Sequence, residues 1–150
     1  MEFPGFGRLT VKGLVNEVGT TPQTFYRRYA SVALLALEVL LKRFGRVEDI
    51  DTGGLESDLL ELQRNDVAMM TTTLIQKNLP GLFEGIRTDG VVRDIYRQKM
   101  ISPRRKNVER VLDRAVGRGE VAALTVDAEY ICDLLFGPLL DEYCYRPNSP

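Results

Sequence analysis

The chain has 150 residues, of which 44% are hydrophobic and 27% charged, and a formal net charge of −1, values typical of one globular domain or one domain with a small appended module. Collagenous, disordered and membrane-spanning classes are excluded, because there is no fixed-period repeat, no low-complexity tract and no run of about 18 apolar residues. The absence of histidine removes imidazole acid–base chemistry and most zinc sites, so we expect no enzyme, no cofactor and no metal.

The start of the chain and its two cysteines both favour a cytoplasmic location. No basic stretch followed by an apolar one occurs in residues 1–10, so we expect no secretory signal. Cys132 and Cys144 are twelve residues apart in one expected helix, where a rise of about 1.5 Å per residue separates them by about 18 Å, beyond disulfide reach. We therefore expect free thiols in a reducing compartment.

Helical patterns recur along the chain and strand signals are weak, which predicts an all-α fold. Thr10 is expected to cap a first helix over residues 11–18, and Gly19 to end it in the left-handed conformation. Thr21 is expected to cap a second helix over residues 22–29, in which a proline takes the first helical position.

Ser31 is expected to cap a third helix that runs to Phe44. Three acids and two glycines make residues 46–54 a loop. One long helix is expected over residues 55–77, with a break at residues 78–81, where a proline and a glycine follow each other.

Beyond this break, we expect a short helix over residues 79–87 and a helical pattern over residues 90–101. Pro103 must then kink or restart the chain, because proline cannot donate a backbone hydrogen bond. Clear helices follow over residues 104–118 and residues 127–143.

Charge is unevenly distributed along the sequence. Residues 1–46 hold seven Lys and Arg against three acids, whereas residues 47–150 hold thirteen against eighteen. The basic part is the candidate polyanion-binding end, although a chance fluctuation explains the excess about equally well.

The expected helix over residues 104–118 has a basic face opposite its apolar stripe. We interpret this face as solvated rather than as a nucleic-acid surface, because Glu109 and Asp113 interrupt it. The next segment, residues 120–142, has six acids and no Lys or Arg, so we expect the two helices to be electrostatic complements within a subunit or across a dimer. The basic side chains are Arg104, Arg105, Arg110, Arg114 and Arg118.

Two short helices joined by a tight turn with a glycine form the arrangement of a DNA-binding helix-turn-helix, although any short helical hairpin has such a turn. The second helix presents the short polar and cationic groups that reading a major groove requires, and its Phe25 and Tyr29 are expected to face inward. The expected base contacts are Gln23, Thr24 and Arg28, and the expected phosphate contacts are Tyr26 and Arg27.

Residues 9–40, LTVKGLVNEVGTTPQTFYRRYASVALLALEVL, resemble the DNA-binding region of the TetR (tetracycline-repressor-like) family. The phrases RAVGRGE at residues 114–120 and LLFGPLL at residues 134–140 are similar to the family's C-terminal ligand and dimerisation region. The matching positions in the first region are Thr10, Val11, Leu14, Val18, Gly19, Thr21, Thr24, Phe25, Tyr26, Tyr29, Ser31 and Leu35.

The resemblance implies a ligand-responsive repressor that binds a pseudo-palindromic double-stranded DNA operator as a homodimer. It implies a DNA-binding segment over residues 1–46, in which Thr10 and Thr21 join the DNA contacts, and a ligand-binding and dimerisation domain over residues 47–150. Candidates for a ligand cavity are Met69, Met70, Phe83, Ile86 and Tyr96, although such residues fill cores more often. Candidates for the dimer interface are Val108, Val111, Leu112, Ala115, Ile131, Leu134, Leu135 and Leu139.

The sequence departs from the family pattern at its beginning, where only nine residues precede Thr10 and the family has a complete first helix. We therefore expect Leu14, Val15, Phe25 and Tyr29 to lose their cover, and the chain to bind operator DNA weakly or not at all. The alternative function is a truncated relative that dimerises and binds a small molecule but does not bind DNA by itself.

Overall fold

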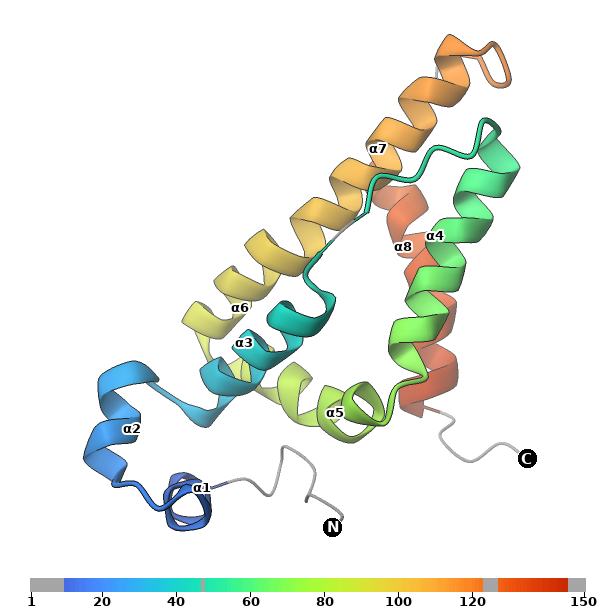
Figure 1. The fold of residues 1–150 in the computed structure, drawn as a ribbon. Helices are drawn as coiled ribbons and strands as arrows, with labels where there is room; N and C mark the ends of the chain where they lie inside the picture. The colour runs from blue at the N-terminus through green and yellow to red at the C-terminus, as the bar shows by residue number, and fades with distance from the viewer. Residues whose placement is uncertain (1–9, 47, 123–126, 146–150) are drawn as a thin grey trace.

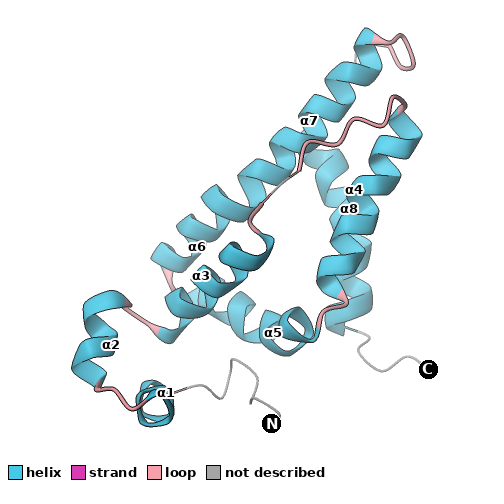
Figure 2. Cartoon of the chain, viewed as in Figure 1, coloured by secondary structure: helices cyan, strands magenta, loops and turns pink. Residues whose placement is uncertain are grey.

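The computed structural model describes residues 10–46, 48–122 and 127–145, and this part of the chain is all-α, with helices joined by loops and no strand (Figure 2). The helices are α1 (Val11–Val18), α2 (Pro22–Arg28), α3 (Val32–Phe44), α4 (Leu55–Met70), α5 (Thr73–Thr88), α6 (Gly90–Tyr96), the π-helical η2 (Arg97–Ile101), α7 (Ser102–Gly117), α8 (Ala128–Leu140) and the π-helical η3 (Asp141–Tyr145).

The first three helices begin at the residues that the sequence predicts. The hydroxyls of Thr10, Thr21 and Ser31 each accept a hydrogen bond from the backbone N–H three residues later, at 3.1–3.2 Å. Gly19 ends α1 with a φ of +72°, a conformation that a β-carbon disfavours, and its N–H bonds to the carbonyl of Val15. The short turn between α1 and α2 is therefore specified locally.

The main core is formed by α3, the end of α4, α5, α6, η2 and the end of α8. Leu37 and Leu40 of α3 are 1–2% exposed and pack with Met70, Leu82 and Val92, which are equally buried. Figure 1 shows α1 and α2 at one end of the molecule, joined to the rest through α3, while α4, α7 and α8 lie together at the other end. The position of α3 thus depends on the same core that holds the C-terminal helices.

The expected long helix over residues 55–77 is wrong, because α4 ends at Met70 and Thr72 caps α5. The expected break at residues 78–81 is also wrong, since Pro80 lies inside α5. A proline in a helix interior costs about 3 kcal/mol, but Leu79 and Leu82 on either side are 7% and 2% exposed, and their burial contributes about 1.5–3 kcal/mol each. Packing of this helix into the core therefore outweighs the local signal.

The chain does not restart at Pro103. It passes from α6 through η2 into α7 with helical dihedral angles throughout, and the N–H of Ser102 bonds to the carbonyl of Arg97, five residues earlier. Pro103 is the second residue of α7 and follows directly on the wider turn of η2. The chain therefore continues as a helix through its proline.

The last two helices agree with the prediction. Asp127 caps α8, with its carboxylate accepting the N–H of Glu129 at 3.0 Å. The side chain of Cys144, and with it the predicted separation of the two thiols, lies outside the described residues, whereas Cys132 is a free, half-buried thiol. Within the described residues, no helix is both long enough and apolar enough to cross a membrane.

Candidate functional site

The second helix of the helix-turn-helix presents polar side chains outward and buries one aromatic ring. Phe25 is 8% exposed and Tyr29 is half-buried, as predicted, whereas Tyr26 is 58% exposed. The predicted DNA-contacting side chains of α2 are all exposed, and they are Gln23, Thr24, Tyr26, Arg27 and Arg28. The face that α2 offers to solvent is therefore polar and cationic.

Several of these groups also make contacts within the chain. The hydroxyls of Thr21 and Thr24 lie 3.0 Å apart, in addition to the cap bond from the Thr24 N–H. The guanidinium of Arg28 lies 5.7 Å from the ring centre of Tyr29. The hydroxyls of Thr10 and Thr21 accept cap bonds and that of Thr24 contacts Thr21, so Gln23 and Arg28 are the better candidates for base contacts.

The expected exposure of the inner side of this motif is wrong. Val15 is 2% exposed and Phe25 is 8% exposed, while Leu14 and Tyr29 are half-buried. The residues before Thr10, on which the expectation of a missing first helix depended, lie outside the described residues. Since the apolar surface is covered, its exposure gives no reason to expect weak DNA binding.

A cavity of about 410 Å³ lies between the end of α3, the loop that follows it, α4, η2, α7 and α8. Of the predicted ligand residues, only Met69 lines it. Met70 belongs to the main core, and Phe83, Ile86 and Tyr96 pack against that core. The lining residues are Arg43, Phe44, Gly45, Arg46, Glu48, Ile50, Leu62, Asn65, Asp66, Met69, Lys99, Met100, Arg104, Asn107, Val108, Cys132 and Leu135.

Sequence reasoning missed most of this cavity because its wall comes from six separate segments, which no local pattern brings together. Arg43 and Arg46 belong to the excess of Lys and Arg in residues 1–46, which predicted polyanion binding and not a ligand cavity. Burial raises the pKa of the Cys132 thiol, which lines the wall as a neutral group. Among the described residues, no group of three Asp, Glu or Cys side chains could hold a metal ion.

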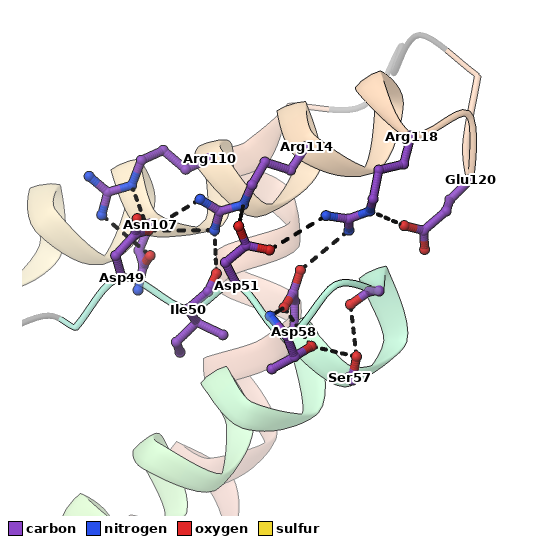
Figure 3. A network of polar contacts seen from close by, with 12 residues as sticks. Asp49, Ile50, Asp51, Ser57, Asp58, Asn107, Arg110, Arg114, Arg118 and Glu120 are labelled. Carbon is purple, nitrogen blue, oxygen red and sulfur yellow. Dashed lines mark hydrogen bonds and ion pairs between the residues drawn. The ribbon is translucent and has the colours of Figure 1, made fainter.

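The basic face of α7 is not a solvated surface, which corrects the expectation. Three of its arginines, Arg110, Arg114 and Arg118, contact carboxylates of the loop between α3 and α4 (Figure 3). Arg114 contacts the carboxylates of Asp49 and Asp51 and also donates to the carbonyl of Ile50, and Arg110 contacts Asp49 at 3.4 Å. The amide of Asn107 donates to the carbonyl of Glu48 at 3.0 Å. The loop that forms one wall of the cavity is thus fixed to α7.

Asp58 is the fully buried acid at the end of this network. Its carboxylate accepts hydrogen bonds from the N–H and the hydroxyl of Thr52, at 2.6 and 2.7 Å, and lies 3.4 Å from Arg118. Burial alone would raise the pKa of Asp58, but these bonds outweigh it and hold the pKa below its ordinary value. Arg118 also pairs with Glu120, which accepts the N–H of Leu55 at the start of α4.

We expected α7 to pair with the acids that follow it in the sequence. Between described residues, two ion pairs of this kind are present. Arg105 pairs with Glu129 at 2.6 Å, and Arg118 with Glu120. Arg104 instead pairs with Asp66 of α4 and lies 4.7 Å from the ring centre of Phe136. The acids that pair with the arginines of α7 therefore come mainly from the loop between α3 and α4 and from α4 itself. Both are far from α7 in the sequence, so their proximity to it was not predicted.

The predicted dimer residues fall into three groups by exposure. Five are buried in the subunit's own core rather than on a free surface, because α7 packs against α4 and α8. These are Val108, Val111, Leu112, Ala115 and Leu139. Ile131 and Leu135 are half-buried, and Leu135 lines the cavity. Leu134 is 56% exposed, and Tyr130, which the prediction omitted, is 58% exposed one turn earlier on α8.

Comparison with known proteins identifies similar proteins that are all described as transcriptional regulators. Residues 49–149 match a family model described as the tetracyclin repressor-like, C-terminal domain. An uncharacterized HTH-type transcriptional regulator from Mycobacterium tuberculosis is 27% identical over 150 residues, covering 97% of this chain and 71% of that protein. A DNA-binding transcriptional repressor TetR from Mycobacteroides abscessus is 29% identical over 157 residues, covering 95% and 80%. A similar regulator from Bacillus subtilis is 24% identical over 139 residues, covering 90% and 68%.

Proposed function

The chain belongs to the tetracycline-repressor-like family of transcriptional regulators, and on this basis we propose that it is a cytoplasmic repressor that binds a pseudo-palindromic DNA operator as a homodimer and responds to a small molecule. The observation that carries the proposal is the helix-turn-helix itself. Its second helix exposes Gln23, Tyr26 and Arg28 while Phe25 anchors it to the motif. A helix of this kind places its N-terminal side chains against base edges in the major groove.

The exposed apolar face of α8 supports a homodimer. Tyr130 and Leu134 are four residues apart, so they lie on the same side of the helix, and each is more than half exposed. Large exposed apolar side chains that gather on one helix face are typical of a subunit interface. A two-fold dimer through this face has two copies of α2, the helix proposed to enter the major groove, which we call the reading helix. A pseudo-palindromic operator requires two such helices.

The path of α3 supports a ligand response. Its first residue, Val32, follows the last residue of α2 by four positions, and its last turn lines the cavity through Arg43 and Phe44. A ligand that prefers one position of α3 therefore changes the spacing of the two reading helices. The ligand can cause release of DNA only if it binds one of the two arrangements more tightly than the other, and the size of the effect is set by that difference in affinity.

The experiment is selection of binding sites from a random duplex library, followed by affinity measurements on selected and random DNA at about 150 mM salt. We expect a selected site with two half-sites about one helical turn apart, bound roughly a thousandfold or more tightly than random DNA. A dimer without sequence-specific binding would instead favour the alternative, a family relative that dimerises and binds a small molecule but does not bind DNA.

A further inference from the structure

We propose that the cavity beside α3 binds an amphipathic anion, a ligand with one acidic head and an apolar body. This inference rests on the proposed ligand response and names the chemical class of the ligand. The cavity volume of about 410 Å³ lies within the range of small-molecule sites in proteins. Its wall combines an excess of positive charge with an apolar surface, and each of these features selects one part of the ligand.

No carboxylate of a described residue forms an ion pair with three of the cations in the wall. Arg43, Arg46 and Lys99 line the cavity and are exposed, and none of them takes part in an ion pair between described residues. Every arginine of α7, in contrast, has a carboxylate partner. The cavity therefore has cations available for a ligand, which distinguishes it from the basic face of α7.

The two acids in the wall do not reverse this balance. Asp66 is ion-paired with Arg104, so this pair contributes no net charge, and Glu48 is the remaining carboxylate. Three cations against one acid leave an excess of two positive charges facing the cavity. A cationic ligand would meet repulsion there, whereas an acidic head forms charge-assisted hydrogen bonds with arginine or lysine.

The apolar part of the wall accommodates a body of hydrocarbon or aromatic character. Phe44, Ile50, Met69, Met100 and Leu135 come from α3, the following loop, α4, η2 and α8. The two methionines have flexible, polarizable side chains that adapt to ligands of different shape. Burial of such a body supplies most of the affinity, and the cations then select among ligands of similar size.

Binding of an anion would act directly on α3, the helix that connects the helix-turn-helix to the rest of the protein. Arg43 is in the last turn of α3, Arg46 in the loop after it, and Lys99 in η2. An acidic head between these groups removes the repulsion among them and draws the end of α3 toward η2. The inference thus links ligand chemistry to the position of α3.

The test uses three probes that share a ten-carbon chain and differ in the charge of the head, namely decanoate, decanol and decyltrimethylammonium. Binding to the full chain is measured by titration calorimetry below the micelle concentration of each probe. We expect decanoate to bind about tenfold more tightly than decanol, and decyltrimethylammonium to bind most weakly. The advantage of decanoate should shrink as salt is raised, because the cations are exposed.

The matched variants remove two positive charges each. Arg43→Gln/Lys99→Gln alters the cavity wall, whereas Lys42→Gln/Lys77→Gln alters two exposed lysines that do not line it. We expect decanoate to bind the first variant about three- to tenfold more weakly and the second as tightly as the unmodified chain. Decanol should bind all three proteins equally, which also shows that the cavity is intact.

Equal binding of decanoate and decanol would overturn the proposal, as would tighter binding of decyltrimethylammonium or no binding of any probe. An equal loss in both double variants would also overturn it, since the effect would then come from net charge. Measurement of operator affinity in parallel separates this inference from the proposed function. Selective decanoate binding by a chain that fails to bind DNA contradicts only the proposed function, and the reverse result contradicts only the anion site.

Discussion

A β-carbon placed on Gly85 of α5 would lie 3.3 Å from the β-carbon of Ala33 in the first turn of α3. It would also lie 3.8 Å from Cγ1 of Val92 in α6, so three helices meet around this glycine. Ala33 follows the reading helix by five residues. The absence of a side chain at position 85 therefore allows the beginning of α3 to approach the body of the protein.

The substitution Gly85→Leu should push α3 away from α5 at this contact. Overpacking of this kind costs about 1–3 kcal/mol, which urea unfolding measures as a lower midpoint. We also expect weaker operator binding, because α3 connects the helix-turn-helix to the rest of the protein. Gly85→Ala is the control, since its single methyl needs a shift of only a few tenths of an ångström and alanine is favoured over glycine in a helix by about 1 kcal/mol. A leucine variant as stable as the unmodified chain would show that this contact does not restrict α3.

Gln23→Ala and Arg28→Ala should each weaken binding to the selected operator by about 1–3 kcal/mol and relax base preference at one position. Tyr26→Phe should weaken binding to all sequences, because its hydroxyl is assigned to the phosphate backbone. Fluorescence anisotropy with operator and random duplexes measures both effects, and Arg64→Ala on the distant α4 is the control. Equal losses on operator and random DNA for Gln23→Ala and Arg28→Ala would contradict their assignment as base contacts.

Leu134→Glu should convert the dimer to a monomer at micromolar concentration, because it places an unpaired charge in the proposed interface. Light scattering measures the mass, and circular dichroism should show an intact helical fold, since Leu134 is 56% exposed in the subunit. Leu135→Glu is a poorer test, because this side chain lines the cavity and its loss also disturbs the interior. If the unmodified chain is a monomer, the two-fold operator model is wrong.

Asp58→Asn should lower the free energy of unfolding by about 2–3 kcal/mol near neutral pH, because it weakens two short hydrogen bonds and the contact with Arg118. The folded-state pKa of Asp58 lies below its ordinary value of 3.8, so its stabilisation is complete above that value and is lost as the pH falls through the lowered pKa. The difference between the two proteins should therefore narrow below about pH 4.

The control for this experiment is Asp49→Asn. Asp49 is exposed and its ion pairs with Arg110 and Arg114 are 3.4 Å long, so the substitution should cost less than about 1 kcal/mol. Urea unfolding at several pH values between about 3 and 7 gives the comparison. A constant difference between Asp58→Asn and the unmodified chain over this range would show that the titration of Asp58 does not contribute to stability.

Local signals predicted the first three helices well, because a cap is a bond between residues three positions apart. Thr10, Thr21 and Ser31 all cap a helix as the sequence indicates. Pro80 shows the limit of such signals, since the burial of Leu79 and Leu82 overrides a residue that normally ends a helix. Local propensity was decisive only where tertiary packing did not oppose it.

One of the two candidate sites was predictable from local sequence signals, and the other was not. The outward and inward residues of α2 follow from helical periodicity, and the structure confirms the burial of Phe25 beside the exposed Tyr26. The ligand cavity could not be predicted, because Arg43 and Lys99 are more than fifty residues apart and come to line one cavity only through the tertiary packing of the helices. The ion pairs of Arg114 and Arg118 with the α3–α4 loop depend on the same long-range packing.

The π segment between α6 and α7 has a consequence for changes in chain length. A hydrogen bond to the fifth residue closes a loop that is one residue longer than that of an α-helix, so η2 holds surplus backbone at one place in a continuous helical stretch. Loss of one residue within η2 can be absorbed by conversion of a wide turn to a narrow one, and α6 and α7 keep their facing sides. Loss of one residue within α7 would instead rotate everything beyond it by about 100° and separate its arginines from the loop carboxylates. Single-residue deletions along this rod should therefore be tolerated within η2 and not within α7.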